Sequence, residues 1–264
     1  MEKRFLAPKE IGNAIINVGV GKANLKTSSM IYLGILAGIY IGFGGLANTI
    51  ISQNLANIDL GLAKFAGAAV FPVGLILVVI AGAELFTGNN LMTLAVMNKK
   101  ITLSQMFRNW GVVWVSNLVG AAFLAFMVFH ANILGGDAAT KAIVIAESKA
   151  SLDIMTLVLS GIMCNILVVL AVWIATSAQD VISKLFACWF PIMLFVLCGF
   201  EHSVANMFFI PMGILLGAKV TIAALIKNLV FVTIGNILGG AIIIPFLYQN
   251  AYLKEEKQSS KQQS

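Results

Sequence analysis

The sequence predicts an all-α integral membrane protein, with six transmembrane helices in two inverted three-helix repeats and with the second and fifth helices broken. Composition is the first observation, because 59% of the residues are hydrophobic and only 11% are charged, against roughly 25% charged in an ordinary soluble domain. The second is a series of apolar runs, each near the roughly 20 residues that cross a bilayer. The third is that polar residues interrupt two of these runs at matching places in the two halves of the chain, as in transporters built from inverted repeats.

Charge and cysteine usage argue against several other classes of protein. The net charge is +6, but the lysines follow the connections between apolar runs and form no basic face, so we expect no nucleic-acid partner. The cysteines, Cys164, Cys188 and Cys198, lie within apolar runs and lack the spacing of a disulfide framework or of a metal site. We therefore expect a lipid bilayer as the surroundings, with no metal and no cofactor.

The chain begins with a predicted amphipathic N-terminal segment, residues 1–27. Ile11, Ile15 and Val18 alternate there with charged and amide residues, which is typical of a helix at the membrane surface. The segment has no continuous apolar run, so we expect no cleaved signal peptide. The first repeat, 28–130, is predicted to contain three spans: 30–51, 65–96 and 107–130. The middle span is too long for one crossing, and polar residues near 87–90 interrupt it.

A polar outer connection, residues 131–153, leads to the second predicted repeat, 154–249. Its three spans are predicted at 154–175, 185–216 and 220–248. The middle span is again too long for one crossing, and it is interrupted between Gly199 and Ser203. A cytoplasmic tail, 250–264, follows, and residues 1–264 together form one membrane domain.

The distribution of lysine and arginine predicts the orientation in the membrane, because positive residues favour the cytoplasmic side. With six crossings and both termini inside, the cytoplasmic side holds every basic residue except five. The five on the outer side are Lys64, Lys141, Lys149, Lys219 and Lys227. We therefore predict a multi-pass protein of the inner (cytoplasmic) membrane with both termini in the cytoplasm.

Polar residues inside the apolar spans recur at nearly constant spacing, which is the evidence for the repeat. The separation is 117 residues in three pairs and 119 residues in a fourth. The pairs are Asn48 with Asn165, Glu84 with Glu201, Asn89 with Asn206, and Asn117 with Asn236. Because each half holds an odd number of spans, the two halves must cross the membrane in opposite directions.

His202 is the strongest candidate for a functional residue. Ionisable side chains deep in a membrane are costly and usually functional, and a broken helix is tolerated only beside protein or a water-filled path. Imidazole can act as a donor, an acceptor or a cation near neutral pH. A single buried histidine is more often part of the core, but the adjacent break and Glu201 favour an ion contact here.

Other polar residues near the breaks have candidate roles of their own. Glu84 and Glu201 are expected to accept hydrogen bonds from the freed amide groups or to take up a proton, and Glu201 is also a candidate for positioning His202. Asn165 and Asn236 are predicted to face the site, the alternative being hydrogen bonds between helices. Thr87 suits a polar loop at mid-depth in the membrane.

The mouth and the constrictions of a path can also be assigned. Lys149 lies just before the fourth span, where a cation would raise the local anion concentration; a solvated loop lysine is the alternative. Large apolar side chains cluster beside the two breaks and permit hydrophobic constrictions that exclude water. These residues are Phe71, Leu75, Leu85, Phe86 and Phe195.

Residues 83–87 (Ala-Glu-Leu-Phe-Thr) and 199–207 (Gly-Phe-Glu-His-Ser-Val-Ala-Asn-Met) resemble the two signatures of the formate/nitrite transporter family, which includes hydrosulfide channels. The resemblance covers essentially the whole chain. It implies an aquaporin-like protomer in a homopentamer, with one pore in each subunit. It also implies constrictions at the five apolar residues above, a loop threonine at Thr87 and a central histidine at His202. Lys149, Asn165, Glu201 and Asn236 fall on further positions that the family uses.

One departure from the family pattern bears on the transported ion. Gly-Asn-Asn follows Thr87, where many formate and nitrite members have serine or threonine, and this resembles the hydrosulfide branch. We therefore predict a channel for small monovalent anions of the hydrosulfide, formate and nitrite class. The alternative is a strictly proton-coupled symporter for weak-acid anions.

Two further classes are weighed against a channel for anions. An enzyme would need a nucleophile or a metal set beside His202, and Cys198 is the only nearby candidate. A water or glycerol channel would usually carry Asn-Pro-Ala where its half-helices begin, and this chain has no such motif.

Overall fold

The computed structural model describes residues 5–254, and this part of the chain is helical apart from its connections. It contains no β-strand, only an isolated bridge between Phe5 and Ala178. The predicted cytoplasmic tail, 250–264, lies outside the described residues from 255 onward, as does the start of the N-terminal segment, 1–4.

The first half of the chain forms two long helices that flank a series of short ones. The elements are α1 (Pro8–Ala23), α2 (Thr27–Ser52), η1 (Leu55–Asn57), α3 (Leu60–Val70), α4 (Val73–Leu77), η2 (Val78–Gly82), α5 (Phe86–Asn89), α6 (Met92–Met97) and α7 (Leu103–His130). The segment η2 is a π-helix. The helix α1 lies within the predicted N-terminal segment, and it buries Ile11 and Ile15 and exposes Val18.

The second half of the chain is also helical throughout, apart from its connections. Its elements are α8 (Gly136–Ser151), α9 (Ile154–Ser177), α10 (Val181–Leu197), α11 (Ser203–Leu215), α12 (Ile222–Ile237), η3 (Leu238–Ile243), α13 (Ile244–Tyr248) and η4 (Gln249–Leu253). The connection predicted at 131–153 is therefore mostly helix. Its buried face consists of alanines four residues apart, from Ala138 to Ala150, which is one stripe of a helix.

Within residues 5–254, five helical segments are long and apolar enough to cross a membrane. They are Thr27–Asn57, Leu60–Gly82, Leu103–His130, Ile154–Ser177 and Ile222–Leu253. The span expected at 185–216 is divided between two shorter apolar helices, α10 and α11. The span expected at 65–96 is divided in the same way. Its first part belongs to the long helical segment that ends at Gly82, and its remainder forms α5 and α6.

Side chains at the helix starts explain several of these boundaries. Asp153 precedes α9 and accepts a hydrogen bond from the amide of Thr156, and Asp180 caps α10 in the same way through Ser183. Such caps satisfy the amide groups that the first helical turn leaves free. Pro72 separates α3 from α4, because proline lacks the amide hydrogen that a continuous helix requires.

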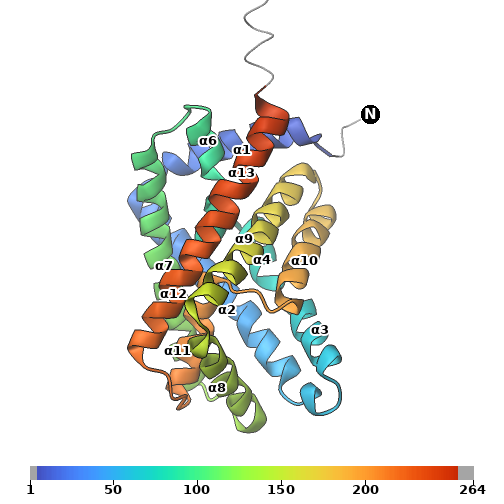
Figure 1. Ribbon diagram of the computed structural model, residues 1–264, viewed down its shortest axis with the longest axis vertical. Coiled ribbons are helices and arrows are strands. Elements are labelled where there is room, and N and C mark those ends of the chain that lie inside the picture. Colours follow the sequence, from blue (N-terminus) through green and yellow to red (C-terminus); the bar gives the residue numbers. More distant parts are fainter. Residues whose placement is uncertain (1–4, 255–264) are drawn as a thin grey trace, which may run out of the picture.

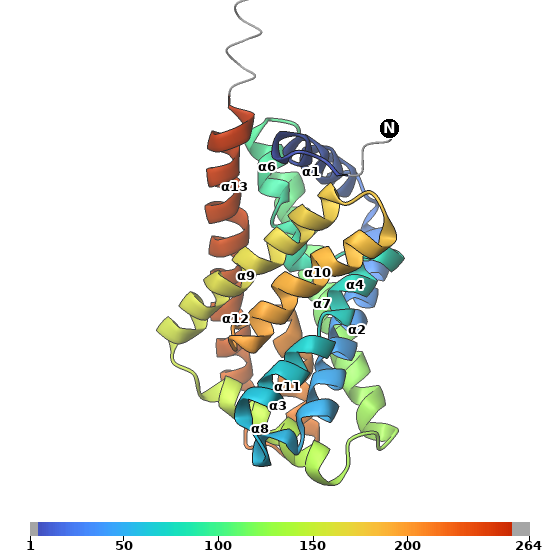
Figure 2. The same cartoon turned by 90° about the vertical axis from the view of Figure 1, so that its right-hand side faces the viewer.

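The helices form an elongated bundle with one short helix at each end. Both views show α1 lying across one end, and α8 lies at the opposite end (Figures 1 and 2). The long helices α2 and α7 pack closely because Gly38 has no side chain; a β-carbon there would lie 2.1 Å from the carbonyl oxygen of Asn117. The pair α9 and α12 packs likewise, since a β-carbon on Gly235 would lie 2.3 Å from the carbonyl oxygen of Val158.

Candidate functional site

The chain leaves the helical conformation at two equivalent places near the middle of the bundle. One helix ends at Gly82, with φ of +87°, and three residues separate it from α5, which begins after Leu85. The other break contains Gly199, with φ of +72°, and α11 begins after His202. Positive φ is accessible to glycine at little cost. Leu85 and His202 hold the same N-cap position with nearly the same backbone angles, −105° and 121° against −113° and 117°.

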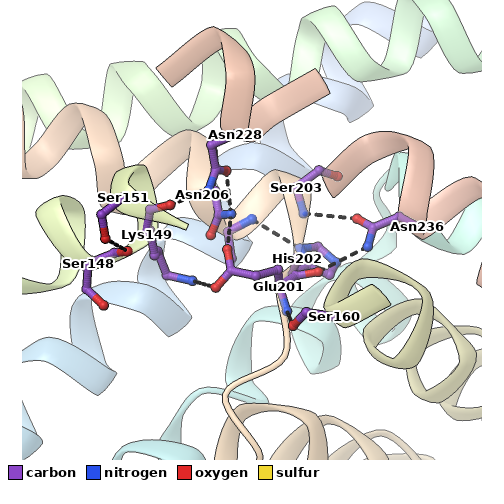
Figure 3. Close-up of polar contacts among 11 residues, drawn as sticks. Ser148, Lys149, Ser151, Ser160, Glu201, His202, Ser203, Asn206, Asn228 and Asn236 are labelled. Carbon is purple, nitrogen blue, oxygen red and sulfur yellow. Dashed lines mark hydrogen bonds and ion pairs between the residues drawn. The ribbon is translucent and has the colours of Figure 1, made fainter. Parts of the chain in front are cut away.

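A closed ring of polar contacts surrounds the second break (Figure 3). The Nζ atom of Lys149 lies 2.7 Å from Oε1 of Glu201. The other carboxylate oxygen of Glu201 accepts a hydrogen bond from the side-chain amide of Asn206 at 2.6 Å. The same side-chain amide donates to Oδ1 of Asn228 at 2.8 Å. The side-chain amide of Asn228 in turn donates to the backbone carbonyl oxygen of Lys149 at 2.9 Å. The buried carboxylate of Glu201 is thus paired and hydrogen-bonded.

The first break has the same ring, made from different elements. Lys22, near the end of α1, lies 2.5 Å from Oε1 of Glu84. Asn89 donates to Oε2 of Glu84 at 2.7 Å and to Oδ1 of Asn109 at 2.8 Å. The amide of Asn109 then donates to the carbonyl oxygen of Lys22 at 3.4 Å. Both rings therefore contain a lysine, a glutamate and two asparagines in the same order.

One further asparagine in each half forms hydrogen bonds with backbone N–H and C=O groups at the break. Oδ1 of Asn236 accepts from the amide of Ser203 at 3.0 Å. Its amide nitrogen donates to the carbonyl oxygens of Glu201 at 3.1 Å and Gly161 at 2.8 Å. In the first half the corresponding contacts run from Asn117 to Phe86, Glu84 and Gly34. These side chains supply partners that a continuous helix would supply itself.

The contacts correct one pairing that equal spacing suggested. Lys22 with Lys149 and Gly34 with Gly161 are 127 residues apart, so the counterpart of Asn165 is Gly38 rather than Asn48. Asn165 donates to the carbonyl oxygen of Asn236 at 2.7 Å, just as Gly38 approaches the carbonyl oxygen of Asn117.

His202 and Thr87 meet at the centre of the molecule. Nδ1 of His202 accepts a hydrogen bond from the amide of Ala205 at 3.1 Å, so the neutral ring carries its proton on Nε2. Nε2 lies 3.0 Å from Oγ1 of Thr87. The Thr87 hydroxyl accepts this bond and keeps its own hydrogen free to donate. Both side chains are buried, and the ring of Phe195 stacks on that of His202 at a centroid distance of 5.8 Å.

Three cavities lie in a row here, and His202 lines two of them, whereas Thr87 lines none of the three. We call the first the Lys149 vestibule, of about 260 Å³, lined by Lys149, Phe71, Phe195 and His202 among others. The Lys22 vestibule, of about 480 Å³, is lined by Lys22, Glu84, Leu75 and Leu85 among others. Between them lies a central chamber of about 10 Å³, close to the minimum of roughly 10–15 Å³ that a single water molecule needs. Its lining residues are Ile41, Phe71, Leu75, Leu85, Val168, Ile192, Phe195 and His202.

The predicted site residues that line these three cavities are Lys149, His202, Phe71, Leu75, Leu85 and Phe195. Thr87 and Glu201 line none of the three, but they are hydrogen-bonded to His202 and Lys149, which do. Phe86 does not line any of these three cavities, and its ring packs edge-on against Trp110 at a centroid distance of 6.0 Å. Asn165 donates to Oδ1 of Asn90 at 2.9 Å and to the carbonyl oxygen of Asn236, and neither Asn165 nor Asn236 lines any of these three cavities. Both asparagines support the backbone around the breaks.

Sequence reasoning missed Lys22, Asn109 and Asn228. Asn109 and Asn228 are 119 residues apart, the spacing already noted for the asparagines that bind the breaks, and this signal could have found them. Lys22 was read as part of a surface helix, and only the 127-residue spacing to Lys149 marks it. Over residues 5–254, no group of three or more histidine, cysteine or acidic residues could hold a metal ion.

Comparison with known proteins gives consistent matches over most of the chain. A family model described as formate/nitrite transporter matches residues 9–249. A "Probable formate transporter" from Methanothermobacter thermautotrophicus is 42% identical over 236 residues, 82% of this chain and 86% of that protein. A solved "FNT family ion channel" matches with a TM-score of 0.86 and 30% identity over 92% of this chain and 98% of the other. A "Pentameric formate channel with formate bound" matches with a TM-score of 0.77 and 33% identity, over 86% and 98% of the two chains.

These relatives are transporters and channels rather than enzymes. Their similarity agrees with the long apolar helices of this chain, which make it a multi-pass membrane protein. The family model spans nearly all of the described residues, including both breaks. The chain therefore belongs to the formate/nitrite transporter family.

Proposed function

We propose that this protein is a passive conduit for small monovalent anions of the formate, nitrite and hydrosulfide class, with one pore in each protomer of a homopentamer. The observation that carries the proposal is the chamber of about 10 Å³, which lies between the two vestibules. It is lined by His202 and by two hydrophobic clusters, Phe71 with Phe195 and Leu75 with Leu85. A solved relative is a pentameric formate channel with formate bound, which supports both the assembly and the class of ion.

The proposed topology has six crossings in two inverted repeats, each with its middle crossing broken at Gly82 or Gly199. The two matching polar rings support this plan, and they extend it, because α1 and α8 each supply the lysine of one ring. Repeat boundaries at 28–130 and 154–249 therefore omit one helix at the start of each half. The lysine and arginine distribution supports insertion in the inner membrane with both termini cytoplasmic. The Lys149 vestibule is then outermost.

The two hydrophobic clusters act as barriers on either side of the histidine. Phe71 and Phe195, whose rings meet edge to face at 5.7 Å, close the chamber toward Lys149. Leu75 and Leu85 line both the chamber and the Lys22 vestibule. Because the chamber holds about one water molecule, an anion crosses it with most of its hydration lost, which is costly without replacement hydrogen bonds. These side chains must also move aside for the ion.

His202 and Thr87 supply the replacement hydrogen bonds. Nε2 of His202 and Oγ1 of Thr87 are hydrogen-bonded to each other at 3.0 Å. An anion that breaks this bond can accept one hydrogen bond from the Nε2 hydrogen and another from the Thr87 hydroxyl. Hydrogen bonds to a charged partner are about twice as strong as neutral ones. Lys149 and Lys22 attract the ion at the two mouths, each moderated by its paired glutamate.

The amide of Ala205 bears on the choice between a conduit and a proton-coupled symporter. A charged imidazolium needs a hydrogen on Nδ1, but Nδ1 accepts the Ala205 amide at 3.1 Å. Protonation of the ring would therefore remove the cap of α11. A neutral ring that gave its proton to the anion would itself become negatively charged, which is unfavourable. The Ala205 contact therefore supports a His202 that donates a hydrogen bond to the anion, rather than one that transfers a proton to it.

The test compares His202→Phe and Thr87→Val with His130→Phe in proteoliposomes. His130 is the other histidine of the chain and contacts Phe126 and Phe129 at the end of α7. Loss of one hydrogen bond to an ion, about 1.5–3 kcal/mol, predicts that formate, nitrite and hydrosulfide fluxes fall by at least about tenfold in both site variants. His130→Phe should retain the normal flux. Unchanged flux in His202→Phe would remove the histidine from the mechanism.

A second measurement separates the conduit from the symporter. In a voltage-clamped bilayer, a conduit gives a reversal potential that follows the anion gradient alone. A reversal potential that shifts with a proton gradient, at fixed anion concentrations, would show obligatory coupling and favour the symporter. Comparing the three anions in the same preparation also decides whether hydrosulfide, suggested by Gly88-Asn89-Asn90, is preferred to formate.

A further inference from the structure

The Lys149 vestibule is more basic than the passage of one monovalent anion requires. Three of its lining residues are lysines, Lys64 on α3 and Lys141 and Lys149 on α8, and none is an aspartate or glutamate. The Lys22 vestibule differs, because its lining includes both Lys22 and Glu84. The repeated scaffold therefore carries extra positive charge at one mouth only.

Two of these three lysines have no acidic partner among residues 5–254. Lys149 is paired with Glu201, but no ion pair of the described part of the chain involves Lys64 or Lys141. Both residues line the cavity, and no acidic side chain of residues 5–254 is paired with them.

The acidic residues on the elements next to this vestibule are engaged elsewhere. Asp59 accepts from the amide of Leu62 at 2.7 Å at the start of α3. Asp137 accepts from the side chain of Asn54 at 2.7 Å, and Glu147 accepts from the backbone amide of Lys219 at 2.8 Å. None of these three acids lines the cavity.

The volume of the vestibule and the narrow chamber next to it limit which ligands these lysines can bind. The volume of about 260 Å³ lies just below the roughly 300–1,000 Å³ of pockets for drug-sized ligands. Phe71 and Phe195 line both this vestibule and the chamber of about 10 Å³ beyond it. Asn48 and Ser52 of α2 add polar groups to the same lining. A ligand of a few carbon atoms with two negative charges fits the vestibule but not the chamber.

We propose that the Lys149 vestibule binds a small dicarboxylate, which bridges Lys64 and Lys141, stops above Phe71 and Phe195, and so blocks the pore without crossing it. The binding follows from the cavity and its unpaired lysines. Only the block rests on the proposed conduction of anions, so the two parts are tested separately.

Binding is measured by isothermal titration calorimetry of the purified full-length protein in detergent, with succinate and acetate as probes. We expect succinate to bind at least about tenfold more tightly than acetate, because its second carboxylate gains a second lysine contact. The variant Lys64→Gln/Lys141→Gln should weaken succinate binding by about tenfold or more and acetate binding by a smaller factor, because acetate contacts only one of the two lysines. Lys64→Arg/Lys141→Arg, which keeps both charges, should retain succinate binding.

Lys219→Gln is the matched control, since it removes one positive charge from an exposed residue that does not line the vestibule. Succinate should bind this variant with normal affinity. Equal affinity for succinate and acetate would overturn the proposal. An equal loss of binding free energy per removed charge in Lys219→Gln and in the double glutamine variant would overturn it as well, because the effect would then be one of overall charge.

The block is measured as formate efflux from proteoliposomes with succinate on the side of the Lys149 vestibule. Wild-type efflux should fall as succinate saturates the site, and the double glutamine variant should require about tenfold more succinate. No succinate should cross, and measurable succinate flux would refute the block. If formate efflux is absent altogether, the proposed conduction fails, whereas the calorimetric result still decides on the binding site.

Discussion

Replacing Lys149 by methionine tests whether the ion pair beside the second break holds the site together. Methionine has nearly the length of lysine, so it can keep the contact with the Phe209 ring, over which Nζ lies at 5.5 Å, while the charge is lost. Glu201, whose side chain is 5% exposed, then keeps only the Asn206 amide as a partner for its carboxylate. A buried carboxylate with too few partners is strongly unfavourable.

The geometry sets the size of the expected effect. At 2.7 Å, the attraction between the two charges is about 6 kcal/mol for an effective dielectric constant of about 20, and desolvation of both groups offsets part of it. Breaking buried pairs costs about 3–5 kcal/mol. Because the Lys149 side chain is 18% exposed, we expect Lys149→Met to lower the free energy of unfolding by about 3 kcal/mol, near the bottom of that range.

The double variant supplies the decisive comparison. Lys149→Met/Glu201→Gln removes both charges, and we expect a free energy of unfolding within about 1 kcal/mol of the wild type, so that the coupling between the two sites is at least about 2 kcal/mol. The assay is denaturation in mixed micelles followed by circular dichroism. Lys22→Met and its double variant with Glu84→Gln should behave alike, since that pair has exposures of 22% and 7%. Single effects that simply add in the double variant would refute the reasoning.

Three further perturbations test the scaffold around the site. Gly199→Ala places a β-carbon at φ of +72° and should lower the free energy of unfolding by about 1–2 kcal/mol. Gly38→Ala, whose β-carbon would meet a carbonyl oxygen of α7 at 2.1 Å, should cost about 1–3 kcal/mol or prevent folding. Gly21→Ala meets nothing within 4 Å and is the shared control; an equal loss there would contradict both expectations. Hydrogen bonds from Thr156 hold the pKa of Asp153 below its ordinary value of 3.8, so its stabilising effect is present above that value and is lost as pH falls through the lower folded pKa. The difference in melting temperature between wild type and Asp153→Ala should therefore be constant from about pH 8 to pH 5 and shrink below about pH 4; a difference that changes near neutral pH would contradict this.

The sequence predicted the breaks because charged residues within apolar runs are conspicuous. Glu84 and Glu201 stand 117 residues apart, and the structure gives them equivalent partners. Asn48 and Asn165 have the same separation but no equivalent contacts, because the first long helix of each half is offset by 127 residues. Constant spacing therefore identifies a repeat, while the contacts alone decide which residues correspond.

Other features could not be predicted for physical reasons. The ion pair of Lys22 with Glu84 joins residues 62 positions apart, and an amphipathic pattern shows which face of a helix is apolar but not what that face touches. The helix α8 was read as a connection because its buried stripe is alanine, which has a weak hydrophobic signal. Phe86 opens a helix of four residues, too short for periodicity to indicate where its ring points.

Leu85 and His202 occupy the same position in the two halves, yet only one of them has a side chain that can bind an ion. In the proposed conduit, one half therefore supplies a hydrogen-bonding side chain at this position and the other half supplies an apolar one. An ion that crosses the proposed pore would meet its favourable contact nearer the second half, so its free-energy profile would be asymmetric although the two polar rings are alike. Reversing the applied voltage should consequently give currents of unequal size, and exchanging the two residues should reverse the direction of that rectification.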